Sequence, residues 1–493
     1  MYFPTLQEFK KKAKEGNLIP VYKEILADLD TPVSAFMRIN DGSYSYLLES
    51  VEGGAKWARY SFLGSNPSII IKGNKELIEI ITNGKKEEIR PGSDPIEVLK
   101  SILARYRPVH VEGLPRFFGG AVGYLSYEMV RYFEEIPDKN KDGLNLPDLY
   151  FVITDTLLIF DNINQTIKVV SNAHIEDDDI EGAYEETRKK IDKIIKKLRQ
   201  DRNLKPAKDV GRQHKLDFSP NMARADFYKM VEEAKEYIKA GDIFQVVLSQ
   251  RFKAEITSDP FSIYRALRVI NPSPYMYYLH FDDLDIVGSS PEVLVRCEDR
   301  RVEVRPIAGT RRRGHTDKED KKLEDELLAD PKERAEHIML VDLGRNDVGR
   351  VSETGKVIVN ELMTIERYSH VMHMVSNVQG ILSKDKDVFG LIRACFPAGT
   401  VSGAPKIRAM EIIEELEPTR RGPYAGAVGY FSFSGNMDTC ITIRTILIKD
   451  KIAYIQAGAG IVADSNPERE YQETVNKARA MVHAVDVAER GLE

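Results

Sequence analysis

The sequence predicts an α+β fold in which a large two-sheet β-sandwich is flanked by helices. One observation behind this prediction is an internal similarity: GGAVGYLS at 119–126 resembles AGAVGYFS at 425–432. A β-rich run follows each copy along the chain, YFVITDTLLIFD after the first and CITIRTILIKD after the second. Similar strands at two places, without regular strand–helix alternation, favour packed sheets over βαβ units.

The first 198 residues alternate between helical patterns and strand-like runs. Helical patterns are predicted at 6–15, 94–106 and 181–198. The strand-like runs include SYLLES, PSIIIKG and LIEIITNG, the last of which ends in an Asn-Gly turn signal. Residues 150–160 and 167–170 are predicted as a strand pair around a turn-prone segment.

A polar segment divides the chain. Residues 199–218 contain proline and glycine and show no periodicity, which predicts a linker. The linker separates an N-terminal part, 1–198, from a second part, 219–493. The second part is predicted to begin with a helix from Ser219 to about Ala240, capped by Gly241, followed by the strand IFQVVLSQRF.

The composition excludes several classes of protein. The 493 residues are 42% hydrophobic and 30% charged, as in a globular chain with a substantial core. A net charge of -6 gives no reason to expect nucleic acid or a membrane as partner. The N-terminal residues lack a signal-peptide pattern, and the three cysteines lack CxxC spacing. We therefore expect a cytoplasmic protein without a disulfide framework or a zinc site.

One predicted helix carries a carboxylate on its apolar side. Asp330-Pro331 is typical of a helix start, and Glu336 falls with Leu340 on the stripe that faces the core. A carboxylate there must be paired, protonated or bound to a metal. Glu333 has a capping-box role as an equally good interpretation.

A second predicted helix, beginning at Asn466-Pro467, carries Glu470, Glu473 and Lys477. A surface ion pair between Glu473 and Lys477 is the plain alternative to a functional role. Two carboxylate pairs without histidine or cysteine beside them nevertheless suit a hard cation, and Mg²⁺ fits best.

Small residues and isolated charges alternate between Cys395 and Lys477. The segments are CFPAGTVSGAPKIRAM, PYAGAVGYFSF, DTCITIRTI, QAGAGIVADS and NPEREYQETVNKAR. Glycine allows the backbone to approach a ligand closely, and fixed charges of both signs suit a small polyanion bound with a metal. These motifs resemble the chorismate-binding enzymes, and among them the large subunits of anthranilate synthase. The resemblance is strong over 219–479 and looser before it.

The resemblance implies a metal site and two catalytic residues. In this family two helices hold Mg²⁺, which neutralises the ring carboxylate of the substrate. The matching ligands are Glu336 and Glu473, with Glu333 and Glu470 as flanking or alternative ligands. Glu292, in GSSPEVL, matches the general acid, because expelling the ring hydroxyl needs a proton donor with a raised pKa. His373 matches a histidine near the reacting ring, although a core histidine is an equally good interpretation.

The resemblance also implies the substrate contacts. The residues that match family contacts to chorismate, or lie beside them, are Gly309, Thr310, Thr400, Tyr424, Arg444, Gly458, Ala459, Gly460 and Lys477. Arg444 also makes chemical sense without the resemblance, because a planar guanidinium can bind a carboxylate through two hydrogen bonds. A surface charge on a strand is the plain alternative for Arg444.

Two positions distinguish subfamilies. Salicylate and isochorismate synthases carry a lysine that activates water in the strand matching IFQVVLSQ, where this chain has Gln245. Because glutamine cannot act as a base, we expect ammonia as the nucleophile at this catalytic position. Aminodeoxychorismate synthases often carry a nucleophilic lysine in PIKGT, where this chain has Ala308. The two positions together favour anthranilate synthase activity, in which ammonia adds to the ring, hydroxide leaves and pyruvate is eliminated.

Two further motifs resemble the family's feedback site for L-tryptophan. The matching residues in LLES and NPSPYMYYL are Leu48, Glu49, Ser50, Pro274, Tyr275 and Met276. Ordinary strands at the join of the two parts are the plain alternative. None of the cysteines has the nucleophile-elbow context of a glutaminase. Ammonia from glutamine therefore requires a separate amidotransferase subunit, expected in a heterotetramer of two large and two small subunits.

Two rival functions remain from the sequence. Aminodeoxychorismate synthase component I would release no pyruvate, and both Ala308 and the tryptophan-site motifs argue against it. A non-catalytic amino-acid sensor on the same fold would have lost its acids, whereas Glu292, Glu336 and Glu473 are all present.

Overall fold

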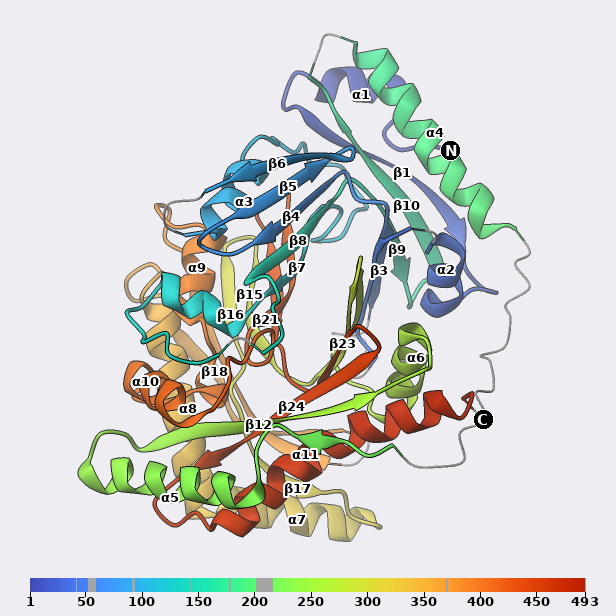
Figure 1. The fold of residues 1–493 in the computed structure, drawn as a ribbon. Helices are drawn as coiled ribbons and strands as arrows, with labels where there is room; N and C mark the ends of the chain where they lie inside the picture. Colours follow the sequence, from blue (N-terminus) through green and yellow to red (C-terminus); the bar gives the residue numbers. More distant parts are fainter. Residues whose placement is uncertain are drawn as a thin grey trace.

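Two large antiparallel sheets surrounded by helices form the protein, as the sequence predicts (Figure 1). The computed structural model describes residues 1–493 except 41, 52–58, 91–93, 142, 177–178, 201–215, 369–370 and 493. Each sheet has 12 strands within the described ranges. The predicted linker, 199–218, falls mostly on 201–215, outside the described residues.

The first sheet combines strands from both parts of the chain. In the order of hydrogen-bonded neighbours its strands are β1 (Leu18–Leu26), β10 (Thr166–His174), β9 (Thr156–Asp161), β3 (Tyr60–Ser65), β2 (Tyr44–Glu49), β13 (Tyr275–Phe281), β14 (Leu284–Ser290), β23 (Thr445–Lys449), β24 (Ile452–Ile461), β12 (Gln245–Glu255) and β11 (Ser219–Pro220), with β20 (Gly403–Ala404) also paired to β12. The two parts meet where β2 pairs with β13, which sets Glu49 opposite Met276.

The second sheet joins the two parts again. Its strands, in the same order, are β17 (Ile307–Arg312), β19 (Val371–Ile381), β16 (Arg301–Val304), β15 (Val293–Glu298), β22 (Met437–Ile441), β21 (Ala427–Ser432), β7 (Gly120–Leu125), β8 (Leu149–Thr154), β4 (Ile69–Gly73), β5 (Ile78–Thr82) and β6 (Lys85–Ile89), with β18 (Ile358–Arg367) paired to β19. The two similar segments lie side by side here, because β7 and β21 pair antiparallel with Gly123 opposite Gly429.

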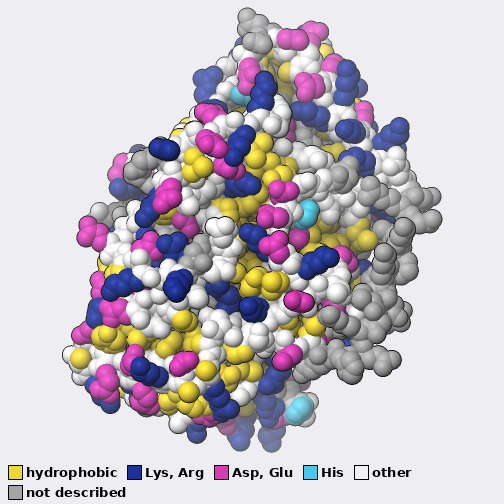
Figure 2. All heavy atoms as spheres, viewed as in Figure 1, with side chains coloured by type: hydrophobic (Ala, Val, Ile, Leu, Met, Phe, Trp, Pro, Cys, Tyr) yellow, Lys and Arg dark blue, Asp and Glu magenta, His cyan; other side chains and the backbone are white. Residues whose placement is uncertain are grey.

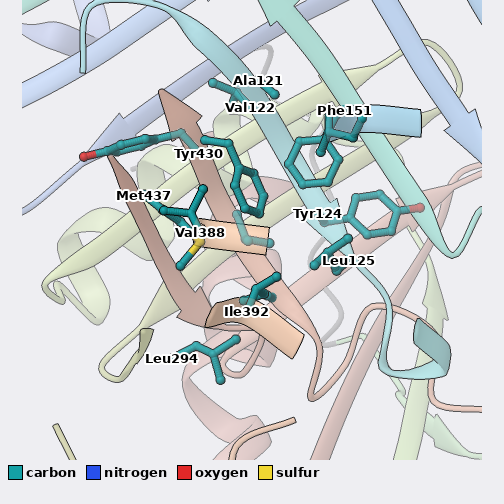
Figure 3. Close-up of a cluster of buried hydrophobic side chains, with 14 of the residues drawn as sticks. Ala121, Val122, Tyr124, Leu125, Phe151, Leu294, Val388, Ile392, Tyr430 and Met437 are labelled. Atoms are coloured by element: carbon teal, nitrogen blue, oxygen red, sulfur yellow. The ribbon is translucent and has the colours of Figure 1, made fainter. Parts of the chain in front are cut away.

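Apolar side chains fill both faces of the middle strands of the second sheet, such as β7 and β8. Between the sheets, the rings of Tyr150 and Phe281 lie 4.9 Å apart and join β8 to β13. The outer face packs against α9 (Val388–Cys395), where Val388 and Ile392 lie over the strands (Figure 3). This packing of β-branched and aromatic residues explains why the small-residue strands are buried on both sides.

Helices cover the outer faces of the sheets. They are α1 (Leu6–Lys12), α2 (Pro32–Ile39), α3 (Ile96–Leu103), α4 (Ile180–Leu198), α5 (Arg224–Ala240), α6 (Pro260–Ile270), α7 (Asp317–Ala329), α8 (Pro331–Gly349), α10 (Lys406–Leu416) and α11 (Pro467–Glu489), with the 3₁₀ turns η1 (Tyr127–Tyr132) and η2 (Gly399–Val401). The long helix α11 packs on β24 and α6, while α8 packs on β17 and β19 (Figure 1). No helix among the described residues is both long and apolar enough to cross a bilayer. On the face shown in Figure 2, basic and acidic side chains are interspersed.

Two local predictions were wrong. The helix expected from Ser219 begins only at Arg224, because Ser219 and Pro220 pair with β12 as an edge strand, where proline needs no hydrogen-bond donor. The single strand expected over 150–160 is two strands, β8 and β9, which belong to different sheets. Only β9 forms the predicted hairpin with β10. Gly241 ends α5 in the left-handed region at φ 85°, as predicted.

Candidate active site

Helix α8 presents Glu336 towards the first sheet. Asp330 caps the helix by accepting from the backbone N–H groups of Lys332 (3.0 Å) and Glu333 (3.3 Å). The Glu333 carboxylate accepts from Nη1 of Arg311 at 2.8 Å rather than completing a capping box. Glu336 is half-buried, and its Oε1 accepts from Nε2 of Gln245 at 3.1 Å. Burial raises the pKa of Glu336, and the charges of Glu333 and Glu473 add to this rise.

Helix α11 brings the second carboxylate pair. Asn466 caps the helix by accepting from the N–H of Arg469. Glu473 forms the ion pair with Lys477 that the spacing predicts, at 2.7 Å. Lys477 Nζ also donates to the carbonyl of Gly458 at 2.9 Å, which joins α11 to β24. Burial raises the pKa of Glu470, and the Glu473 charge contributes.

The acids of the two helices suit a divalent cation. The charge of the exposed Glu473 contributes to the raised pKa of both Glu336 and Glu470, and a bound cation would relieve this repulsion. Across the described ranges, no three His, Cys, Asp or Glu side chains are already arranged around a metal position. Mg²⁺ commonly takes one or two carboxylates and completes its shell with substrate oxygens and water. Glu336 and Glu473 fit that donor set. Their metal role stays a prediction.

Arg444 offers a guanidinium to this site from a turn. It lies between β22 and β23 with φ 51°, a left-handed conformation that is uncommon for arginine and often occurs at functional sites. Its Nη1 donates to the carbonyl of Lys477 at 3.3 Å. Burial lowers the pKa of Arg444, and Tyr424 and Glu473 oppose this effect. The ion pairs of the described residues include none for Arg444, so its guanidinium can donate to a ligand carboxylate.

Two glycines of β24, Gly458 and Gly460, leave room on one face of the strand for the side chains of Tyr424 and Gln245. A Cβ at Gly458 would lie 2.7 Å from the hydroxyl of Tyr424, and a Cβ at Gly460 would lie 2.5 Å from Nε2 of Gln245. Both glycines therefore let neighbouring side chains approach the strand closely. The Ala459 side chain points to the other face and packs in the apolar cluster of α5 and α10. Of the QAGAG segment, Gly458 and Gly460 therefore face Tyr424 and Gln245, whereas Ala459 does not.

We expect Gly460→Ala to lower kcat/KM by about 10- to 100-fold, because displacing Gln245 by about an ångström misplaces the site. Steady-state kinetics of the purified variant would measure this change. Gly349→Ala is the matched control, because a Cβ there meets no atom within 4 Å. Parent-like kinetics of Gly460→Ala would contradict the placement of Gln245.

Glu292 lies immediately before β15, in a protected position. It is buried beside a cavity of about 50 Å³ that Thr400, Asp347 and Leu343 also line. Burial raises the pKa of Glu292 to about 8, against the opposing influence of the Thr400 hydroxyl and the Lys477 ammonium. At neutral pH Glu292 therefore holds a proton, as a general acid must.

Gly309, Thr310 and His373 form another edge of the site. Gly309 occupies a bulge between β17 and β19 at φ 75°, and a Cβ there would lie 3.1 Å from Oε2 of Glu333. The Thr310 hydroxyl lies 3.0 Å from Nδ1 of His373. Burial lowers the pKa of His373, and the charge of Arg444 adds to this effect. His373 is therefore a neutral imidazole near Arg444.

Comparison with known proteins shows the family to which the chain belongs. Residues 50–483 match the family described as chorismate binding enzyme. The chain is 52% identical to anthranilate synthase component 1 from Acetivibrio thermocellus and 50% identical to that from Aquifex aeolicus, over 99% of both chains in each case. The crystal structure of anthranilate synthase component I from Streptococcus pneumoniae TIGR4 matches with a TM-score of 0.78 and 41% identity, covering 93% of this chain and 99% of that chain.

The chain belongs to the chorismate-binding enzymes.

In this chorismate-binding enzyme, the two motifs predicted to form a tryptophan site lie side by side. The Val51 N–H donates to the carbonyl of Ser273 at 3.2 Å, just beyond the pairing of β2 with β13. The Glu49 carboxylate is buried and accepts from Tyr264 and, at 2.9 and 3.1 Å, from Arg268. Glu49 thus has protein partners within this region.

The other predicted effector residues lie around the same junction. Leu48, Ser50, Pro274 and Tyr275 are half-buried there, and Met276 is fully buried. The Tyr275 hydroxyl donates to Asp438 at 2.8 Å and so reaches the second sheet. An effector role of these residues stays a prediction.

Sequence reasoning missed two residues of this chorismate-binding enzyme. Asp347 lines the Glu292 cavity and pairs with Lys406 at 2.7 Å. Arg421 is completely buried beneath Tyr424. The only sequence signal for Arg421 is its position in RRGPY, three residues before Tyr424.

Proposed function

We propose that the protein converts chorismate and ammonia into anthranilate, pyruvate and water, as the names of its relatives suggest. The observation that carries this proposal is that a protonated acid, Glu292, and a guanidinium, Arg444, both lie near Lys477, and that the ion pairs of the described residues include none for Arg444. Such a pair suits a substrate that has a carboxylate to bind and a hydroxyl to expel. Gln245 and Ala308 favour ammonia over water or an enzyme nucleophile.

The residues divide the chemistry between them. Arg444 binds a substrate carboxylate, and Tyr424 and Gln245, which lie close over Gly458 and Gly460, contribute the adjoining wall of the site. Glu292 donates its proton to the departing hydroxyl group, which leaves as water when ammonia adds to the ring. Loss of pyruvate then makes the ring aromatic. We assign to the neutral imidazole of His373 the role of orienting a substrate oxygen through a hydrogen bond.

We assign a metal and a partner on supporting grounds. Mg²⁺ held by Glu336 and Glu473, with Glu333 and Glu470 nearby, would neutralise the negative charge of the substrate carboxylate. The component 1 names of the relatives imply a second component, which we propose is a glutamine amidotransferase in a heterotetramer of two large and two small subunits. The three cysteines are buried free thiols, which supports a reducing compartment such as the cytoplasm.

Incubation with chorismate, Mg²⁺ and ammonium tests the proposal directly. We expect fluorescent anthranilate and an equal amount of pyruvate to form. An amino product without pyruvate would instead indicate aminodeoxychorismate synthase. No turnover of chorismate, by contrast, would favour a sensor without catalytic activity.

We further propose that L-tryptophan binds at the β2–β13 junction and inhibits the enzyme. An apolar slot with a few placed polar groups suits the indole and the zwitterion of tryptophan. Because β2 and β13 come from the two parts of the chain, tryptophan there would favour one placement of the parts by its differential affinity.

We expect Ser50→Phe to fill this slot and abolish inhibition while turnover is kept. Anthranilate formation is measured against tryptophan concentration for the parent and the variant. Ser43→Phe is the control, because Ser43 is exposed just before the other end of β2. If Ser50→Phe stays as sensitive as the parent, the effector site lies elsewhere.

A further inference from the structure

Arg421 is the largest completely buried side chain among the described residues. Its Nε donates to Oε2 of Glu417 at 2.9 Å, and its Nη2 donates to Oε1 at 2.6 Å. Both side chains of this ion pair are at most 2% exposed. Burying an ion pair costs more free energy than it returns unless its remaining donors and acceptors are also satisfied. The other partners of Arg421 therefore reveal what the pair holds in place.

The remaining donors of Arg421 go to the backbone of two walls of the active site. Nη1 donates to the carbonyl of Val401 at 2.7 Å, and Val401 follows Thr400, which lies beside Glu292. Nη2 donates to the carbonyl of Val247 at 2.7 Å. Val247 is opposite Gly460 in the pairing of β12 with β24. One guanidinium thus fixes the acid side and the glycine side of the site relative to each other.

The guanidinium group of Arg421 lies over the rings of two tyrosines. Its guanidinium carbon lies 4.7 Å from the ring centre of Tyr127 and 5.6 Å from that of Tyr424. The Tyr424 hydroxyl lies against Gly458, where a Cβ would come within 2.7 Å. Stacking on a guanidinium restricts the position of an aromatic ring. Arg421 therefore also holds the third wall, which carries a predicted substrate contact.

The support of Arg421 extends into the N-terminal part. The backbone N–H of Arg421 donates to Oε1 of Glu128, in η1, at 3.0 Å. Glu417 Oε1 also accepts from the N–H and the hydroxyl of Ser249 in β12, both at 2.8 Å. The pair is thus anchored in η1, β12 and η2, three elements far apart in sequence.

We propose that Arg421, oriented by Glu417, is a positioning residue that sets Tyr424, the Thr400–Val401 segment and β12 in their catalytic arrangement. This inference rests on the proposed function. Lysine cannot replace Arg421, because a single ammonium cannot pair with a carboxylate through two nitrogens, reach two carbonyls and stack on a ring at the same time.

Kinetics of Arg421→Lys test this role. We expect kcat/KM for chorismate to fall by about 10- to 100-fold, with a rise in KM, because the walls of the site move by fractions of an ångström. A variant that is only destabilised would have fewer folded molecules, which lowers the apparent kcat but leaves KM unchanged. Circular dichroism and thermal melting report the folded fraction independently.

Arg296→Lys is the matched control, assayed without tryptophan. Arg296 is a buried arginine that holds Asp438 through Nε and Nη2 at 3.0 and 2.9 Å. We expect Arg296→Lys to lose thermal stability as Arg421→Lys does. Its KM for chorismate should stay within about twofold of the parent, because residues that share no partners usually act independently.

A milder variant covers the case in which Arg421→Lys does not fold. Ser249→Ala removes one hydrogen bond to Glu417, and we expect a smaller rise in KM with the fold kept. Parent-like KM values in Arg421→Lys and Ser249→Ala, or in whichever of the two folds, would overturn the inference. A parent enzyme that forms no anthranilate would instead refute the proposed function, so the two failures are distinguishable.

Discussion

Glu292→Gln is expected to lower kcat by about 10²- to 10⁴-fold, the range that general acid catalysis contributes. The amide has the shape of the carboxyl group but cannot donate a proton to a leaving hydroxyl group. Because burial raises the pKa of Glu292 to about 8, the parent side chain is already neutral at pH 7. Glutamine therefore adds no buried charge change, and the fold should be kept.

The pH dependence of the parent enzyme provides a second measurement of the same group. Glu292 must hold its proton, so kcat/KM should be constant below its pKa of about 8 and fall as the pH rises through that value. Rates must be expressed per free ammonia, since the ammonia fraction itself rises with pH. A Glu292→Gln enzyme with parent activity and the same alkaline decrease would assign the acid to another residue.

Glu336→Gln and Glu473→Gln are each expected to reduce Mg²⁺-dependent turnover by about 100-fold or more, comparable to the loss of one group that stabilises charge in a transition state. Each change removes one negative charge from the site that we propose holds a divalent cation. Titration of activity with Mg²⁺ should show a higher half-saturating concentration in both variants.

The direction of the metal's pH dependence follows from burial. Burial and neighbouring carboxylates raise the pKa of Glu336, so protons compete with the metal at low pH and Mg²⁺ affinity should increase as the pH rises. Glu468→Gln is the matched control, because Glu468 is exposed in the first turn of α11 and contacts Arg224. Parent-like Mg²⁺ titrations of both Glu336→Gln and Glu473→Gln would remove these residues from the metal site.

The sequence predicts the architecture well where local patterns decide it. The repeated small-residue strands and the β-rich run that follows each of them indicate two sheets, and Asp330-Pro331 and Asn466-Pro467 mark the starts of α8 and α11 correctly. These signals act through neighbouring residues only, such as a side-chain cap or a fixed proline φ. The pairing of the two repeats with each other, Gly123 opposite Gly429, depends on tertiary packing that no local pattern specifies.

The candidate site is less accessible to sequence reasoning. The left-handed turn at Arg444 depends on how β22, β23 and β24 are arranged. So does the orientation of the Ala459 side chain, which points away from the site into an apolar cluster. Arg421 next to Arg420 looks like an exposed basic pair, and only the packing of η1 and β12 around it makes it buried. Sequence patterns thus identify residue types that can do chemistry, whereas long-range contacts decide which of them face the same space.

The pairing of β2 with β13 and of β7 with β21 has a consequence for the integrity of the chain. Both sheets run without interruption through the two parts on either side of the polar segment. Either part expressed alone would have bare strand edges in two sheets, and such edges invite aggregation. The two parts should therefore melt as one cooperative unit. An exchange of parts between relatives would succeed only where the β2–β13 and β7–β21 pairings both match.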